Sequence, residues 1–277
     1  MKTERGSLAR TRTKGPVLYF SSVAGDDKKA IVGIVPGYAD YADRYEAVQR
    51  AWAERGLASV AIDLRGHGHA EGPRGACREW NDYMDDVREL FVLLEARAEG
   101  KPILLFGHSF GGLVAASWTC DNASSQKALV LSAPFMRVAL PVPALKKKAG
   151  RIVSKLLPSV GLASGLRGDQ MTSVEALQKQ YDTDPLVFKK ANARWFTCAE
   201  DAQADVMSRA KSITLPLYVA FGTDDGVVAG ARELYEAAGS TDKKLDVREG
   251  LRHEILFEPT GPAITAAMAD WMLAHAQ

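Results

Sequence analysis

The sequence has few of the features that mark several common classes of protein. Its three cysteines, Cys77, Cys120 and Cys198, form no CxxC pair, so neither a zinc site nor a disulfide framework is predicted. No stretch approaches the ~20 apolar residues of a membrane span. Charged residues are spread over residues 1–14, which lack the apolar core of a secretory signal. We therefore expect free thiols that are buried or partly buried, in a cytoplasmic chain.

Net charge is also nearly absent. The chain has 35 Lys and Arg residues against 34 Asp and Glu, a formal net charge of +1, which predicts no global attraction to nucleic acid. The charge is nevertheless uneven, because no acidic residue lies between Asp121 and Asp169. Eight basic residues lie in that stretch: Lys127, Arg137, Lys146, Lys147, Lys148, Arg151, Lys155 and Arg167.

Short apolar runs alternate with longer amphipathic segments along most of the chain. Strands are predicted at 16–22, 30–37, 57–66, 101–107, 127–135, 215–222 and 243–249. Helices are predicted at 44–56, 81–100, 110–118, 229–239 and 261–276. This alternation predicts an α/β fold with a mostly parallel sheet that helices cover on both faces.

The alternation stops after residue 136. From 137 to about 211 the sequence reads as helical pieces separated by Pro and Gly, with no obvious strand. We therefore expect a single α/β core, formed by residues 1–136 and 212–277, into which residues 137–211 are inserted as a helical lid.

A G-x-S-x-G motif, Gly107 to Gly111, supplies the candidate nucleophile Ser109. The motif follows a predicted strand directly and precedes a predicted helix directly. In so sharp a turn, side chains at Gly107 and Gly111 would collide with the neighbouring backbone, and the serine hydroxyl is exposed at the carboxyl end of the sheet. The structural alternative is an ordinary glycine-rich turn between a strand and a helix.

A serine at neutral pH needs a base to act as a nucleophile. Among the five histidines, His253 follows the last predicted strand and fits the chain order Ser…Asp…His. His108 is adjacent to Ser109 in sequence, and we expect it to point away from the serine in a tight turn. We therefore predict His253 as the base, the alternative being a polar loop histidine.

An acid should orient the imidazole of that histidine and stabilise its protonated form. Asp224 and Asp225 follow the strand that ends at Gly222. We favour Asp225, because three residues after the glycine allow a short turn before the side chain faces inward. Asp224 is then expected to be solvated, or to cap the next helix.

Two backbone amides are predicted to bind the oxyanion of a tetrahedral intermediate. One is the N–H of Phe110, the residue after the nucleophile. The other comes from the loop after strand 30–37, where Pro36 has no N–H and Tyr38 is the leading candidate. The Tyr38 phenol either lines the acyl pocket or packs as a surface aromatic.

Several stretches together resemble the α/β-hydrolases of the monoacylglycerol lipase and lysophospholipase type, which are sometimes grouped with serine aminopeptidases. The resemblance is carried by PGYADYADRY (36–45), AIDLRGHGHAEGPRG (61–75), GHSFGG (107–112), FGTDDGVV (221–228) and GLRHEILFEP (250–259). It implies an α/β-hydrolase fold with a helical lid after strand six. It also implies Ser109, Asp225 and His253 as triad, with Tyr38 and Phe110 as oxyanion donors.

Two positions depart from the pattern of this family. The chain has Pro36-Gly37 where the family usually has His-Gly, and Tyr41 where it often has another histidine. Neither position carries the triad. Both lie beside the acyl and leaving-group pocket, so the departures concern the substrate rather than the reaction.

The predicted reaction is two-step hydrolysis of a carboxylic ester, on a monoacylglycerol or lysophospholipid-type substrate, without metal or organic cofactor. The same triad would also serve an aminopeptidase, an amidase or a small-ester esterase. An aminopeptidase needs acidic groups to hold a free amine, for which Glu200, Asp201 and Asp205 are candidates. A third hypothesis is a non-catalytic binding protein with the hydrolase fold.

The beginning of the predicted lid is basic and amphipathic. If residues 144–157 are helical, an apolar stripe forms from Ala149, Ile152, Val153 and Leu156, flanked by Lys147, Lys148, Arg151 and Lys155. Such a helix could lie at a lipid surface and give peripheral membrane contact. Alternatively, it packs its stripe on the core and leaves its lysines solvated.

Overall fold

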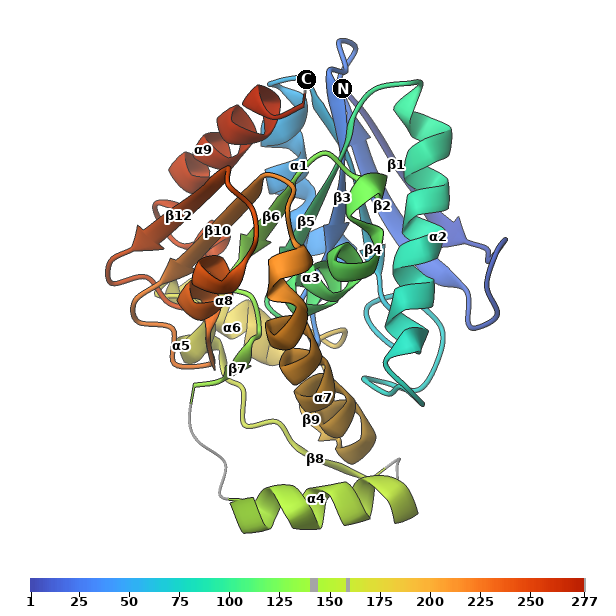
Figure 1. Cartoon of the computed structure of the whole chain (residues 1–277), viewed down its shortest axis with the longest axis vertical. Helices are drawn as coiled ribbons and strands as arrows, with labels where there is room; N and C mark the ends of the chain where they lie inside the picture. The colour runs from blue at the N-terminus through green and yellow to red at the C-terminus, as the bar shows by residue number, and fades with distance from the viewer. Residues whose placement is uncertain (140–143, 158–159, 277) are drawn as a thin grey trace.

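The computed structural model of the protein describes residues 1–139, 144–157 and 160–276, and this part of the chain contains an eight-stranded sheet (Figure 1). The sheet has the strand order β1-β2-β4-β3-β5-β6-β10-β12. Its strands are β1 (Lys2–Leu8), β2 (Leu18–Ala24), β3 (Ala30–Val35), β4 (Leu57–Asp63), β5 (Ile103–His108), β6 (Leu129–Ser132), β10 (Leu217–Gly222) and β12 (Lys243–Arg248).

The strands from β4 to β12 pair in parallel, whereas β2 pairs antiparallel with both β1 and β4. Every residue of β3 and β4 is buried. Side chains of β3 alternate between the two core clusters, with Ile31 and Val35 in one and Ala30, Val32 and Ile34 in the other. The prediction of a mostly parallel sheet covered on both faces is confirmed.

Helices cover the two faces of the sheet unequally (Figure 1). One core cluster includes residues of α1 (Glu46–Ala53) and α9 (Gly261–Ala274), which also contact each other. The other includes residues of α2 (Asn81–Ala98), α3 (Phe110–Asn122) and α8 (Ala231–Ala237). Because α3 starts where β5 ends, it fixes the position of Ser109 at the carboxyl edge of the sheet.

Residues 137–211, which we call the inserted segment, follow β6 and precede β10 in the sequence, although these two strands are neighbours in the sheet. The segment contains β7 (Arg137–Val138), α4 (Ala144–Leu156), β8 (Gly161–Ala163), α5 (Gly168–Met171), α6 (Glu175–Thr183), β9 (Lys190–Asn192) and α7 (Ala193–Arg209). Its α4 lies at the end of the molecule farthest from the chain termini (Figure 1). The expectation of no strand here is wrong: β8 pairs with β9, and β7 pairs with β11 (Val228–Ala229).

The amino-terminal strand β1 is absent from the predictions. It pairs with β2 along its full length, from Lys2 opposite Ala24 to Leu8 opposite Leu18. The strand lies at the edge of the sheet and none of its residues is buried. Within the described residues, no helix is both long and apolar enough to cross a membrane.

Candidate active site

Ser109 occupies a strained turn between β5 and α3. Its backbone has φ 53° and ψ −119°, a conformation that costs a non-glycine residue free energy. A Cβ at Gly107 would overlap the Gly111 carbonyl oxygen, and a Cβ at Gly111 would overlap the Val35 carbonyl oxygen. The predicted reason for both glycines is confirmed, and the turn aims the Ser109 hydroxyl into a cavity above the sheet.

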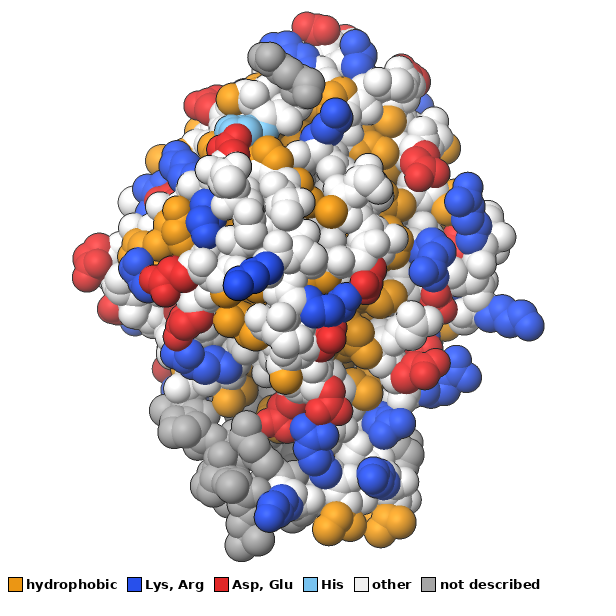
Figure 2. All heavy atoms as spheres, viewed as in Figure 1, with side chains coloured by type: hydrophobic (Ala, Val, Ile, Leu, Met, Phe, Trp, Pro, Cys, Tyr) orange, Lys and Arg blue, Asp and Glu red, His pale blue; other side chains and the backbone are white. Residues whose placement is uncertain are grey.

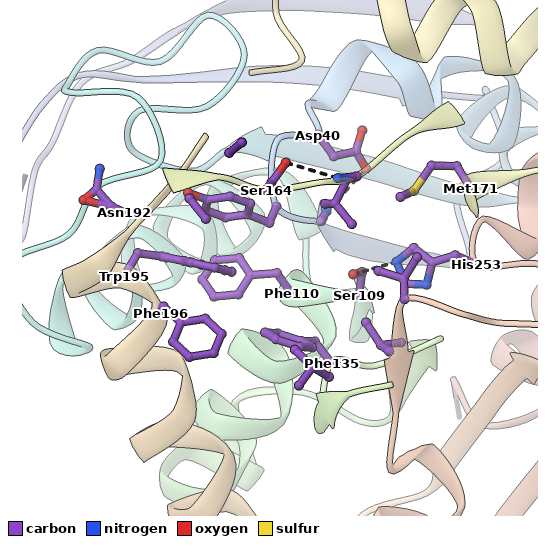
Figure 3. Close-up of a pocket in the computed structure, with 18 of the residues that line it drawn as sticks. Asp40, Ser109, Phe110, Phe135, Ser164, Met171, Asn192, Trp195, Phe196 and His253 are labelled. Carbon is purple, nitrogen blue, oxygen red and sulfur yellow. Dashed lines mark hydrogen bonds between the residues drawn. The ribbon is translucent and has the colours of Figure 1, made fainter. Parts of the chain in front are cut away.

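Ser109, His253 and Asp225 form a continuous hydrogen-bonded chain, of which Figure 3 shows the contact between Ser109 and His253. The Ser109 Oγ lies 2.8 Å from His253 Nε2, and His253 Nδ1 lies 2.7 Å from Asp225 Oδ2. An ionised Asp225 can only accept, so Nδ1 carries the proton and Nε2 of the neutral ring accepts from the serine. The sequence predicted all three residues, and the structure brings them together.

The surroundings of Asp225 and His253 determine the charge that each side chain carries. Burial alone would raise the pKa of Asp225, but the contact with His253 and two backbone amides, of Val227 and Val228, hold it below its usual value. Burial alone would lower the pKa of His253, but the Asp225 carboxylate raises it above its usual value. Asp225 is therefore an anion that makes His253 a stronger base.

The neighbouring Asp224 does not contribute to this chain. Its side chain is exposed and accepts a hydrogen bond from the Thr223 hydroxyl. Asp225, in contrast, is only 6% exposed at its side chain. The short pairing of β7 with β11 begins at Val228 and so holds the loop that carries Asp225 against the start of the inserted segment.

The two amides predicted as oxyanion donors both belong to residues that line the cavity with Ser109. Neither the Tyr38 amide nor the Phe110 amide donates a hydrogen bond to another described residue. The loop of Tyr38 approaches the nucleophile closely, since a Cβ at Gly37 would lie 3.3 Å from the Ser109 Cβ. The Tyr38 ring stacks on Trp195, with 3.7 Å between ring centroids.

A buried ion-pair network supports the site, and sequence reasoning missed it. Asp40 accepts a hydrogen bond from the Gly37 amide at 3.3 Å, and Arg44 Nη1 contacts the other Asp40 oxygen at 2.9 Å. Arg44 also donates two hydrogen bonds of 2.8 Å to Glu254, the residue after His253. Arg44 thus ties the loop of the candidate oxyanion hole to the loop of the base.

His108 does not turn away from the site completely. It lines the same cavity, its ring centroid lies 5.0 Å from that of His253, and its Nδ1 contacts the Ser132 backbone and hydroxyl oxygens. Burial, reinforced by the nearby His253, lowers the pKa of His108 to about 3. It is therefore a neutral neighbour of the base.

The cavity in front of Ser109 has a volume of about 680 Å³ and is lined mainly by apolar side chains. Near the nucleophile it is bordered by aromatic rings, among them Phe110, Phe135, Trp195 and Phe196 (Figure 3). Farther along, residues of the inserted segment complete it, including Val153 of α4. Among the residues that the structure describes, no cluster of His, Cys, Asp or Glu is arranged to hold a metal ion.

The parallel sheet, the strained serine turn and the hydrogen-bonded chain of Ser109, His253 and Asp225 are features of an α/β-hydrolase. Residues 26–260 match the family described as serine aminopeptidase, S33, and the chain belongs to this family. Its curated relatives include a monoacylglycerol lipase from Mycolicibacterium smegmatis, 28% identical over 94% of this chain and 93% of that protein. A phospholipase from Bacillus subtilis is also 28% identical, over 84% of this chain and 91% of that one.

Solved structures agree on the fold. A monoacylglycerol lipase from Paleococcus ferrophilus superposes with a TM-score of 0.85 at 24% identity, over 93% of this chain and 99% of that chain. A monoglyceride lipase from Saccharomyces cerevisiae, in complex with a substrate analogue, superposes with a TM-score of 0.84 at 19% identity, over 98% of this chain and 96% of that chain. The chain is therefore a monoacylglycerol lipase-like α/β-hydrolase.

Proposed function

We propose that the protein hydrolyses carboxylic esters by acyl transfer to Ser109. The Ser109 hydroxyl attacks the ester carbonyl while His253 takes its proton, and the protonated imidazole then gives that proton to the leaving alcohol. Water attacks the acyl-enzyme with the same base and releases a carboxylic acid. The hydrogen-bonded chain from Ser109 to Asp225 is the observation that carries this proposal.

The amides of Tyr38 and Phe110 stabilise the oxyanion in both steps. Their donors are uncommitted within the described residues and border the same cavity as the nucleophile. The Asp40–Arg44–Glu254 network joins the loop that carries Tyr38 to the loop that carries His253, because Asp40 lies on the first loop and Glu254 on the second. Preorganised donors of this kind commonly supply several kcal/mol of transition-state stabilisation.

The substrate proposed is a monoacylglycerol or a lysophospholipid-type ester. The mainly apolar lining of the cavity suits an acyl chain, and its size suits a single chain. The curated relatives named as a monoacylglycerol lipase and a phospholipase support the same classes of substrate. In this view the inserted segment acts as the lid, because α4, β8 and α7 all contribute residues to the cavity wall.

The cavity is less suited to the substrate of an aminopeptidase, which carries a free amine. Its lining includes the carboxylates of Asp40 and Glu254, and Arg44 pairs with both. Glu200, Asp201 and Asp205 do not line it, and Asp201 and Asp205 pair with arginines on the surface of the inserted segment. Neither carboxylate lining the described cavity is therefore uncompensated and able to bind a substrate amine.

A chain-length series of monoacylglycerols and p-nitrophenyl esters tests this function, with Ser109→Ala as the control. Each methylene buried in the cavity is worth about 0.8 kcal/mol, so kcat/KM should rise about fourfold per methylene until the cavity is full. Ser109→Ala should abolish turnover. A preference for acetyl esters, or for aminoacyl amides, would favour the esterase or aminopeptidase alternative.

We also propose peripheral membrane contact through α4. Val153 faces the cavity, and Ser154 is buried with its hydroxyl 2.7 Å from that of Thr197. Ile152 and Leu156 point outward, with 61% and 74% of their surface exposed. Figure 2 shows hydrophobic and basic side chains together over α4 at the bottom of the molecule.

This arrangement suits a helix that lies in a lipid surface at the outer end of the acyl cavity. Lys148, Arg151 and Lys155 are exposed on the same helix. The side chains of Lys147 and Ala149, which belong to the predicted helix, lie outside what the structure describes. A stripe packed wholly on the core would have buried Ile152 and Leu156.

Vesicle co-sedimentation of Ile152→Ser combined with Leu156→Ser tests the membrane contact. Loss of two inserted apolar side chains should weaken binding at least about tenfold. Turnover of a water-soluble ester should stay within twofold of the unmodified protein. Unchanged partition to vesicles would exclude this helix as the contact.

A further inference from the structure

A second cleft lies apart from the catalytic cavity and is strongly basic. It has a volume of about 1290 Å³ and shares Asn192 with the catalytic cavity, but it contains neither Ser109 nor His253. The Tyr38 phenol lies between the two, with its oxygen 3.1 Å from the Gly75 carbonyl and 3.2 Å from that of Lys190. The cleft is therefore a separate site from the proposed ester-binding cavity.

Basic residues from three regions of the chain converge on this cleft, with a single carboxylate among its lining residues, Asp82. The cations are Lys14, Arg65, Arg74, Arg78, Lys155, Lys189, Lys190 and Arg194. They come from the loop before β2, from the loop after β4, and from the inserted segment. The cleft is therefore lined by both the α/β core and the inserted segment.

Most of this positive charge is uncompensated. Arg65 pairs with Asp82 and Asp86, and Lys189 pairs with Asp182. Arg78 also pairs with Asp82, at 3.4 Å. The other five have no carboxylate within 4.0 Å among the described residues: Lys14, Arg74, Lys155, Lys190 and Arg194.

Two of the uncompensated guanidinium groups are already held in place. Arg74 donates to the Gly68 carbonyl at 2.7 Å, and Arg194 donates to the Arg78 carbonyl at 2.7 Å. Each has further N–H groups available for a ligand. Arginine presents a planar fork of donors that matches phosphate oxygens, and lysine adds a point charge.

We propose that this cleft binds a phosphate-bearing anion. The protein as a whole carries a formal charge of only +1, so attraction of an anion depends on this local concentration of cations rather than on net charge. The phosphate could belong to the headgroup of an anionic lipid or to a soluble compound. A lipid source is favoured by position, because Lys155 lines the cleft and lies next to Leu156, which is 74% exposed.

Binding at this site should join the inserted segment more firmly to the core. Like charges from both regions face one cleft and repel each other, and an anion between them removes that repulsion. The site does not depend on the proposed hydrolysis, since none of the three catalytic residues lines it. Binding is therefore measured on Ser109→Ala protein, which cannot consume a lipid probe.

The test compares two triple variants in that background. The cleft variant combines Lys14→Ala, Lys155→Ala and Lys190→Ala, none of which has a side-chain partner among the described residues. The control combines Lys101→Ala, Lys127→Ala and Lys211→Ala, which are exposed and lie near the amino ends of β5, β6 and β10, outside the cleft. Both variants lose three positive charges.

Two probes identify the source of the phosphate: pyrophosphate by calorimetry, and vesicles containing phosphatidylglycerol, against phosphatidylcholine alone, by co-sedimentation. We expect the cleft variant to weaken binding at least tenfold, and the control to stay within twofold. Loss confined to pyrophosphate assigns a soluble ligand, and loss of both probes assigns a headgroup. Loss confined to the vesicles would report only the membrane contact of α4, which carries Lys155, and would overturn the proposal. No binding of either probe, or equal losses in the two variants, would overturn the proposal.

Discussion

The substitution Asp225→Asn tests the assignment of the acid most sharply. The Asp225 Oδ1 accepts hydrogen bonds from the amides of Val227 and Val228, at 2.8 and 3.0 Å. An asparagine must therefore keep its carbonyl oxygen there and turn its NH₂ group toward His253. The imidazole Nδ1 then has to accept, so its proton moves to Nε2, where it faces Ser109.

This tautomer cannot take a proton from the serine, although the geometry of the site is almost unchanged. We expect kcat to fall by about 10⁴-fold, the loss known for the same change in a serine protease triad, which corresponds to about 5.4 kcal/mol. Steady-state turnover of a soluble p-nitrophenyl ester at neutral pH measures it. The exposed Asp224→Asn is the matched control and should keep at least half of the activity.

Retention of more than a tenth of kcat in Asp225→Asn would refute this reasoning. An equal loss in Asp224→Asn would do the same, because it would show that the charge of the loop matters rather than the contact with His253. Thermal denaturation of both variants checks that the fold is intact.

Three further outcomes follow from the structure. Replacing Arg44 by Met leaves two buried carboxylates unpaired and should lower the free energy of unfolding by about 3–5 kcal/mol in urea titration; a loss below about 1 kcal/mol would contradict the network. Gly111→Ala should give inactive or unfolded protein, whereas Gly150→Ala, in open space on α4, should raise stability slightly by calorimetry. Because Asp225 raises the pKa of His253, kcat/KM should increase with pH through a midpoint above about 6.5, the ordinary histidine value. A midpoint well below that would contradict the raised pKa of His253.

The core of the fold could be predicted because its strands are continuous apolar runs that alternate with amphipathic helices. β1 could not, since KTERGSL mixes charged and small residues, as is common for an edge strand that buries nothing. The strands β8 and β9 are three residues each. Such short pairs arise from tertiary contacts and leave no periodic signal in the sequence.

The candidate triad was predictable for a different reason. Ser109 is fixed by a local motif, and Asp225 and His253 follow strands whose carboxyl ends must share one edge of the sheet. The link between Arg44 and Glu254 spans 210 positions, and no spacing rule connects them. The basic cleft likewise forms only when the loop after β4 meets the inserted segment, although the excess of positive charge in the inserted segment was visible beforehand.

The central claim is that Ser109 becomes acylated by the ester substrate. The most direct measurement is labelling with a fluorophosphonate probe, followed by peptide mass spectrometry. The account predicts one adduct, on the peptide that contains Ser109, which disappears in Ser109→Ala and forms far more slowly in His253→Ala. An unlabelled Ser109 in folded protein, or an adduct on another serine, would contradict it.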